Sequence, residues 1–258
     1  MNKTMKTTTR STLIATILLM PSMSHAATLT AAYDFEGNAN DGVGSNDLTL
    51  NTGSSLGTLA GRDALLVTTS AGNASVATPD SNLSIPTDGA DDGKFSIAMW
   101  MNYNSSTDQY ARALARSYSE GGYNIAFTDG SATTSTLNFR VEDPGFTTLR
   151  TTASISRDTW HHVAFSFDNG AVTAWIDGVQ ETLTTDGGGS VAGEEAFVLG
   201  AATTAGASGF SGAFDDVSFF HGVLNQSEVD GLITAVPETS TTALLGLGGL
   251  ALIMRRRK

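Results

Sequence analysis

The chain has 258 residues, a formal net charge of −12 at pH 7 and no cysteine. An acidic surface of this kind repels nucleic acid and anionic membranes, so neither is an expected partner. Without cysteine no disulfide can hold the fold, and stability must come from a packed core, with metal as an optional aid.

The first 26 residues match the three-part pattern of a secretory signal. Basic residues at Lys3, Lys6 and Arg10 precede an apolar run at 13–20, and small residues end the segment at Ala26. A membrane-spanning helix needs roughly 20 apolar residues, so the run is too short for the alternative of an N-terminal anchor. We expect signal peptidase to cut after Ala26.

The last segment, residues 235–258, combines an apolar run at 243–254 with a basic end at 255–258. The alternative is a buried helix or strand, which four terminal cations disfavour. With its start at Val236-Pro237-Glu238, the segment resembles the PEP-CTERM sorting signal of Gram-negative bacteria, although Thr239 stands where proline is usual. The resemblance implies an exosortase-type protease as partner, membrane contact before processing, and placement at the cell surface or in the extracellular matrix.

Residues 27–234 form the expected folded domain, with seven basic and 25 acidic residues. Short apolar runs separated by Gly, Ser, Thr, Asn and Asp are typical of strands and turns. One short helix is expected in "LNQSEVDGLI", because Asn225 and Glu228 have capping-box spacing. We expect strands at 29–35, 48–50, 63–67, 74–77, 95–103, 123–128, 137–142, 147–152, 160–167, 171–176, 196–199 and 213–220.

Two adjacent histidines in "TWHHVAFSF" raise the question of a metal or catalytic centre. Successive side chains on a strand point to opposite faces. His161 therefore shares a face with Val163 and Phe165, whereas His162 shares the other with Trp160 and Ala164. Because the two rings point apart, we interpret them as structural.

The stretch "TWHHVAFSFDNGAVTAWIDGV" resembles the central hairpin of laminin-G-like, concanavalin A-like jelly-roll domains. Three further stretches fit in order: "YDFEGNANDGVGSNDLTL", "FSIAMWMN" and "GFSGAFDDVSFFHGVLNQSEVDGLI". The resemblance implies an all-β fold, a two-sheet antiparallel jelly-roll sandwich with one short C-terminal helix. One fold of this kind serves both lectins and enzymes, so it leaves the function open.

Catalytic residues are not evident in the sequence. Glucanases of this broad fold carry Glu-x-Asp-x-x-Glu on one strand, and the nearest match, starting at Glu228, lacks the last glutamate. Glu194 and Glu195 are neighbours and would face opposite ways, and Asp34 with Glu36 is a weak pair. Since no nucleophile or phosphate-binding motif is present either, we expect a protein that is not an enzyme.

A calcium site is implied by the resemblance, because related jelly rolls bind calcium between the first-strand loop and the closing strand. Calcium prefers several oxygen ligands. The candidates are Asp34, Glu36, Asn38 and Asp41, together with Asp215 or Asp216. In a regular strand only one of the last two can point at a given site. The alternative is a solvated acidic rim.

Sugar binding is the second possibility, because exposed aromatic rings beside polar groups suit sugars. The candidates are Tyr103, Tyr110, Tyr118 and Tyr123; the alternative is that they cover a sheet edge. The sequence thus favours an exported, non-catalytic surface or matrix protein that binds polysaccharide or a protein partner. A polysaccharide-cleaving enzyme, either a glycoside hydrolase or a lyase, and a purely structural matrix protein are the alternatives.

Overall fold

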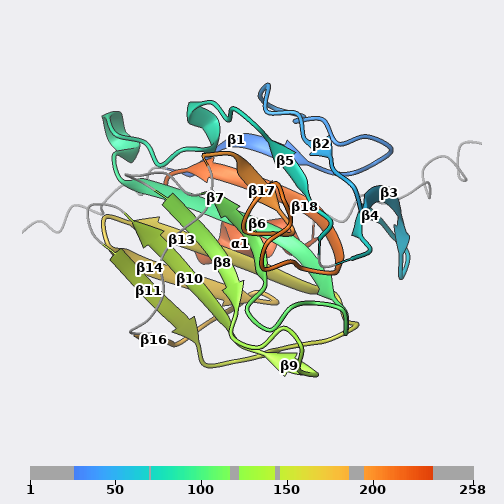
Figure 1. Cartoon of the computed structure of the whole chain (residues 1–258). Coiled ribbons are helices and arrows are strands. Elements are labelled where there is room, and N and C mark those ends of the chain that lie inside the picture. The colour runs from blue at the N-terminus through green and yellow to red at the C-terminus, as the bar shows by residue number, and fades with distance from the viewer. Residues whose placement is uncertain (1–25, 70, 117–121, 143–145, 186–194, 235–258) are drawn as a thin grey trace, which may run out of the picture.

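The computed structural model describes residues 26–69, 71–116, 122–142, 146–185 and 195–234. Two antiparallel sheets pack face to face in a sandwich (Figure 1), which confirms the predicted fold class. The predicted signal segment up to residue 25 and the predicted sorting segment from residue 235 lie outside these ranges. Within them, no helix combines the length and apolarity needed to cross a membrane.

The first sheet, sheet A, is antiparallel, and the histidine strand lies inside it with a neighbour on each side. Its strands, in spatial order, are β15 (Val179–Gln180), β14 (Ala171–Ile176), β13 (His161–Asp168), β6 (Lys94–Tyr103), β18 (Gly212–His221), β4 (Arg62–Val67) and β3 (Ser54–Leu59), with β1 (Thr28–Tyr33) also pairing with β18.

The second sheet, sheet B, is also antiparallel and faces sheet A across the core. Its strands, in spatial order, are β16 (Leu183–Thr185), β11 (Phe146–Thr151), β10 (Leu137–Glu142), β8 (Gly122–Phe127), β7 (Arg112–Arg116), β17 (Phe197–Leu199), β5 (Ala74–Val76) and β2 (Thr49–Leu50). A small third sheet pairs β12 (Ile155–Ser156) with β9 (Thr134–Ser135).

The core lies between the sheets because alternate side chains of each strand face inward. In β6 these are Phe95, Ile97, Met99 and Met101, all at most 3% exposed. Phe95 packs edge-on against Phe165 of β13, with ring centroids 5.4 Å apart. The predicted alternation in these two strands is therefore confirmed.

One helix, α1 (Gln226–Thr234), packs on the outer face of sheet A. Its capping box forms as predicted: the Asn225 N–H donates to Glu228 Oε2 at 2.8 Å, and the Glu228 N–H donates to Asn225 Oδ1 at 3.1 Å. Val229 of the helix is fully buried in a cluster with Trp175 and Ala164 of the sheet. The helix thus buries part of a sheet face that would otherwise expose apolar side chains.

The connection from β5 to β6, residues 77–93, runs from sheet B to sheet A at one end of the sandwich. It contains the two short 3-10 helices η1 (Ser81–Leu83) and η2 (Gly89–Asp91). Asp80 caps η1, because its Oδ1 accepts the Asn82 N–H at 2.8 Å. Most residues that line the cavity described below belong to this connection.

Candidate functional site

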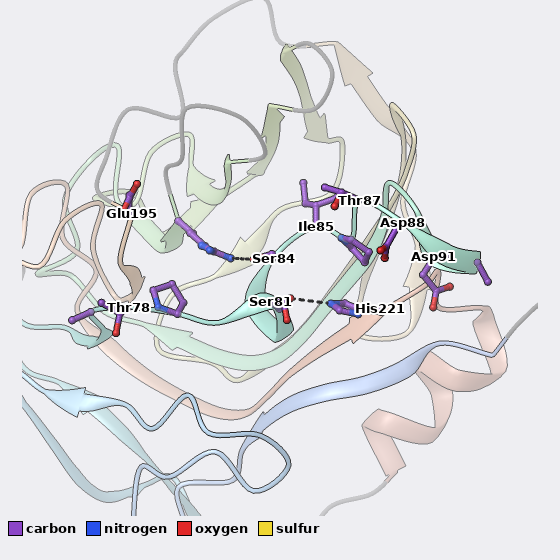
Figure 2. A pocket seen from close by; sticks show the side chains of 15 residues that line it. Thr78, Ser81, Ser84, Ile85, Thr87, Asp88, Asp91, Glu195 and His221 are labelled. Carbon is purple, nitrogen blue, oxygen red and sulfur yellow. Dashed lines mark hydrogen bonds between the residues drawn. The ribbon is translucent and has the colours of Figure 1, made fainter.

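A cavity of about 1090 Å³ opens along the β5–β6 connection (Figure 2). Two contacts shape it: Arg116 Nη1 donates to Ser84 Oγ at 2.7 Å, and His221 Nε2 lies 3.3 Å from the Ser81 carbonyl oxygen. The lining residues are Ala77, Thr78, Pro79, Ser81, Ser84, Ile85, Pro86, Thr87, Asp88, Gly89, Ala90, Asp91, Arg116, Glu195 and His221. We call this cavity the end groove.

The end groove combines apolar walls with polar groups of both hydrogen-bonding types. Pro79, Ile85 and Pro86 supply apolar surface, while hydroxyl and carboxylate groups come mainly from residues 78–91. A few polar groups set in apolar walls are typical of small-molecule sites. The sequence analysis missed this site, because its members are brought together by a loop that changes sheets and carry no motif.

The predicted calcium ligands on the closing strand bind an arginine. Arg62 Nε contacts Asp215 Oδ2 at 2.9 Å, and Arg62 Nη2 contacts Asp216 Oδ2 at 2.9 Å. Burial raises the pKa of Asp215 to about 7, the Asp216 carboxylate adds to the rise, and Arg62 opposes it. The guanidinium thus supplies the positive charge that these two carboxylates face.

A β-bulge explains why both aspartates reach one guanidinium. The β18–β6 register shifts between Asp215 and Ser218, and Asp216 has a φ of 48°. A bulge inserts one extra residue and changes which face the following side chains occupy. The expectation that only one of the two aspartates can serve a given site is therefore wrong, because it assumed a regular strand.

The buried carboxylate of the first-strand loop, Asp41, accepts hydrogen bonds from the backbone. Asp41 Oδ1 accepts the N–H groups of Ala32 and Val43, both at 3.0 Å, and Oδ2 accepts the Asn46 N–H at 3.3 Å. Burial alone would raise the pKa of Asp41, but these donors and the Gly44 N–H together hold it below its usual value. Asp41 therefore organises the loop.

The other three loop candidates, Asp34, Glu36 and Asn38, are exposed. Asp34 Oδ1 accepts the Glu36 N–H at 3.2 Å, and Asn38 Oδ1 accepts the Asn40 N–H at 2.8 Å. In the described part of the chain, no group of three or more His, Asp or Glu side chains is arranged to hold a metal ion. Backbone N–H groups contact the carboxylate of Asp41, and Arg62 contacts those of Asp215 and Asp216. Calcium binding by the six candidates stays a prediction.

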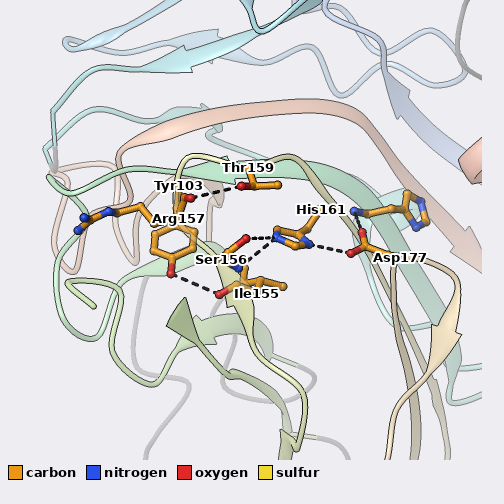
Figure 3. A network of polar contacts seen from close by, with 8 residues as sticks. Tyr103, Ile155, Ser156, Arg157, Thr159, His161 and Asp177 are labelled. Atoms are coloured by element: carbon orange, nitrogen blue, oxygen red, sulfur yellow. Dashed lines mark hydrogen bonds and ion pairs between the residues drawn. The ribbon is translucent and has the colours of Figure 1, made fainter. Parts of the chain in front are cut away.

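His161 links β13 to β12 and to the turn between β14 and β15 through both ring nitrogens (Figure 3). Its Nε2 lies 2.9 Å from Ser156 Oγ and 3.0 Å from the Ser156 nitrogen, and its Nδ1 lies 2.8 Å from Asp177 Oδ2. Because the Ser156 N–H donates to Nε2, Nδ1 carries the proton toward Asp177. The order serine, histidine, carboxylate resembles a nucleophilic triad. In a triad the free ring nitrogen of the histidine accepts the proton of the serine hydroxyl, but here the same nitrogen, Nε2, also accepts the backbone N–H of Ser156.

His162 points to the other face, as predicted. Its ring meets Trp100 edge-on with centroids 5.3 Å apart. Burial lowers the pKa of His162 to about 4, Asp177 opposes this shift, and Arg62 adds to it. The two histidine rings thus make separate sets of contacts, and only the backbone N–H of His162 joins His161 at Asp177, donating to Oδ1 at 2.9 Å.

The predicted aromatic platform does not form. Tyr103 and Tyr123 are fully buried, and Tyr123 Oη donates to the Leu83 carbonyl at 2.7 Å. Both lie on inward-facing positions of their strands, so the prediction that they bind a sugar is wrong. Tyr110 is 62% exposed and stays a candidate, and Tyr118 lies outside the described residues.

A family model described as the concanavalin A-like lectin/glucanases superfamily matches residues 70–230. Domain 4 of AbnA, a GH43 extracellular arabinanase from Geobacillus stearothermophilus solved with arabinotriose, superimposes with a TM-score of 0.60 at 21% identity, covering 81% of this chain and 100% of that one. The binding domain of Paraclostridial Mosquitocidal Protein 1 gives a TM-score of 0.59 at 14% identity, covering 81% of this chain and 52% of that one. The receptor binding domain of botulinum neurotoxin D gives a TM-score of 0.57 at 11% identity, covering 80% of this chain and 52% of that one. No curated protein matches.

Proposed function

The chain belongs to the concanavalin A-like lectin/glucanases superfamily, and from that premise we propose that it is a non-catalytic carbohydrate-binding protein of the cell surface or extracellular matrix. Export by signal peptidase and sorting by an exosortase-type protease are part of this proposal. The observation that carries it is the end groove, a cavity of about 1090 Å³ on the fold that in one solved structure holds arabinotriose.

The chemistry of the end groove suits a neutral sugar. Asp88, Asp91 and Glu195 line it with carboxylates, which accept hydrogen bonds from sugar hydroxyls, and Arg116 is the one cation among its lining residues. Carboxylates repel anionic groups, so uronic acids and sulfated sugars are disfavoured there. Pro79 and Pro86 supply rigid apolar surface for the faces of sugar rings.

Titration calorimetry of the full-length protein with arabinotriose and a panel of neutral oligosaccharides tests the proposal. We expect Asp88→Ala to weaken binding about tenfold, the effect of losing one hydrogen bond to a charged group. Asp34→Ala is the matched control, because it removes the same charge from an exposed site in the first-strand loop. Failure of the whole panel to bind, or equal binding by both variants, would contradict the proposal.

The same samples distinguish the alternatives. Release of reducing ends or unsaturated products from the sugars would make the protein an enzyme. A protein partner is the second candidate, because two structures of similar fold are toxin binding or receptor-binding domains. Calcium stabilisation stays a prediction; melting curves with calcium and with a chelator test it, and identical curves would contradict it.

A further inference from the structure

The residue expected to begin the mature chain lies against the helix at the other end of the domain. The Ala27 N–H donates to Glu228 Oε1 at 3.3 Å, although 201 positions separate the two residues in the sequence. Ala27 is half-buried and packs against the hydrophobic cluster that contains Val229 of α1. Figure 2 shows the blue start of β1 beside this helix. The helix therefore holds the start of the domain through both a polar and an apolar contact.

The carboxylate of Glu228 is already held in place by the capping box. Its Oε2 accepts the Asn225 N–H at 2.8 Å, and the Glu228 N–H donates to Asn225 Oδ1 at 3.1 Å. The other oxygen, Oε1, faces the nitrogen of Ala27. Because the capping box orders the glutamate side chain, a group at Ala27 can pair with Oε1 at little further cost in side-chain entropy.

Cleavage of the bond between Ala26 and Ala27 changes the group that Glu228 meets. In the uncut chain the Ala27 nitrogen belongs to a neutral amide. Hydrolysis adds the hydroxyl of water to the Ala26 carbonyl carbon and its hydrogen to the Ala27 nitrogen, and the new amine takes up the proton that the new carboxyl group releases. An α-amino group has an ordinary pKa of about 7.7–8.0, so it is mainly an ammonium at pH 7. Hydrogen bonds from an ammonium to a carboxylate are roughly twice as strong as neutral ones.

A second carboxylate borders the same space. A Cβ added to Gly222 would lie 3.2 Å from Ala27 Cα and 3.1 Å from Asp91 Oδ1, so the strand β18 ends between these two groups. Glu228 of α1 and Asp91 of η2 thus approach the Ala27 nitrogen from two different elements. Opposite charges within about 4–6 Å favour the charged form of a titrating group. The surroundings of Ala27 therefore suit an ammonium better than an amide.

Opposing charge comes from Lys94, from His221 when it is protonated, and from the amino end of α1. Lys94 is beside Gly222, whose N–H donates to its carbonyl at 3.0 Å, but Lys94 Nζ is directed to the Ala90 carbonyl at 3.5 Å. His221 directs Nε2 to the Ser81 carbonyl at 3.3 Å. The amino end of a helix carries roughly half a positive charge. Since both side chains are directed to other partners, the two carboxylates dominate at Ala27.

We propose that cleavage after Ala26 creates an ammonium at Ala27 that pairs with the Glu228 carboxylate and fastens the mature N-terminus to α1. The helix ends at Thr234, and the predicted sorting segment begins at the next residue of the sequence. Removal of the signal segment at one end of the chain thus stabilises the helix that precedes the sorting segment at the other. The proposal rests on export by signal peptidase, which is part of the proposed function.

The mature protein itself tests this. The full chain is expressed in a Gram-negative host, and mass spectrometry of the exported protein should show Ala27 as its first residue. NMR titration should then place the pKa of the α-amino group at least about 0.5 above the ordinary 7.7–8.0, a roughly threefold gain in proton affinity. A form that begins at Ala26 is the matched comparison. Its ammonium is displaced by one residue, about 3.8 Å along the chain, so its pKa should stay in the ordinary range.

Two variants of the helix assign the effect. Glu228→Gln removes the charge but keeps a residue that suits the capping box, and it should return the pKa of the Ala27 amino group to the ordinary range. Asp230→Asn is the control, because it removes a carboxylate of the same helix that contacts Gln226, and it should leave that pKa unchanged.

Urea unfolding measures the consequence for stability. Because pairing raises the pKa in the folded state, the stabilisation is fully present below the ordinary pKa and is lost as the pH rises through the raised one. The mature form should therefore unfold at a higher urea concentration than the form beginning at Ala26 at pH 7, and this difference should disappear by about pH 10.

The possible failures are distinguishable. A chain that keeps its first 26 residues contradicts both export and the pairing. An exported chain that begins at a residue other than Ala27 overturns the pairing and leaves export intact. An ordinary pKa in the mature form, or an equal lowering of the pKa by Glu228→Gln and Asp230→Asn, overturns the pairing as well.

Discussion

Arg62 and Trp100 form a cation–π pair, with the guanidinium carbon 4.5 Å from the centroid of the indole ring. The second tryptophan, Trp160, lies 5.6 Å away from the same carbon. Since Arg62 also pairs with Asp215 and Asp216, one side chain links β4, β6 and β18 on the outer face of sheet A. Its aromatic neighbours exclude water and thereby strengthen the ion pairs.

Replacing Arg62 tests this arrangement. Arg62→Ala leaves Asp215, which is 5% exposed, without its cation, and should lower the free energy of unfolding by about 3–5 kcal/mol. Arg157→Ala, at an exposed pair with Asp158, should cost about 0–1 kcal/mol. Urea unfolding measures both. Equal losses in the two variants would show that the outer-face ion pair has no special role.

The buried ring of His162 predicts a loss of stability in acid. Burial lowers its pKa in the folded protein from 6.5 to about 4. Between these values the unfolded chain binds a proton that the native state does not, so the free energy of unfolding falls as the pH falls through this window. The full contribution is present above pH 6.5 and amounts to about 3 kcal/mol.

His162→Phe removes this titration, so the stability of the natural protein relative to the variant should decrease by about 2–3 kcal/mol between pH 7 and pH 4.5. Asp215, whose raised pKa of about 7 acts in the opposite direction over this range, is present in both proteins and cancels in the difference. Urea unfolding at the two pH values measures the effect. A difference that is independent of pH would contradict the prediction.

Asp41 should contribute stability to the first-strand loop through the N–H groups it accepts. In Asp41→Asn an amide NH2 replaces one accepting oxygen and faces backbone N–H donors. We expect the free energy of unfolding to fall by about 1–3 kcal/mol. Because the folded pKa lies below the ordinary value of 3.8, the contribution is present above pH 3.8 and disappears as the pH falls through the folded pKa. Melting curves of Asp41→Asn and of the exposed control Asp34→Asn, expected to be near neutral, check this.

Gly212, at the start of β18, permits a close approach of two backbones. A Cβ there would overlap the Asn102 carbonyl oxygen, and the φ of Gly212 is 147°. Gly212→Ala should therefore lower the free energy of unfolding by about 3 kcal/mol or more, because overpacking and backbone strain add. Gly61→Ala is the control: its φ is 88° but nothing lies within 4 Å of the new Cβ, so about 1–2 kcal/mol is expected. Similar unfolding free energies for both would refute the clash.

Much of the fold could be predicted because alternation and turn residues act locally. The hairpin expected at 160–167 and 171–176 forms as β13 and β14, with Val163 opposite Ile176. The helix was found from its cap. The strand β3 was missed because "SSLGTL" is weakly apolar and its turn uses Ala60 with a φ of 51°, where Asn or Gly is usual.

The sites were harder to predict, for different reasons. Burial of Tyr103 was readable in the sequence, since it continues the inward alternation of Ile97, Met99 and Met101, and that signal was overlooked. The end groove depends on how residues 77–93 cross between sheets, which no local pattern specifies. The contact of Asp216 with Arg62 depends on a β-bulge, and no residue pattern in "FDDVSFF" predicts that bulge.

The bulge in β18 has a consequence for how the closing strand can vary. With Asp216 removed, Phe214, Val217 and Phe219 would still face the core, and Asp215, Ser218 and Phe220 would still face outward. A one-residue deletion normally turns every following side chain of a strand over, but here it would restore a regular ladder. The closing strand could therefore gain or lose Asp216, the second carboxylate beside Arg62, with no change in which of its side chains face the core.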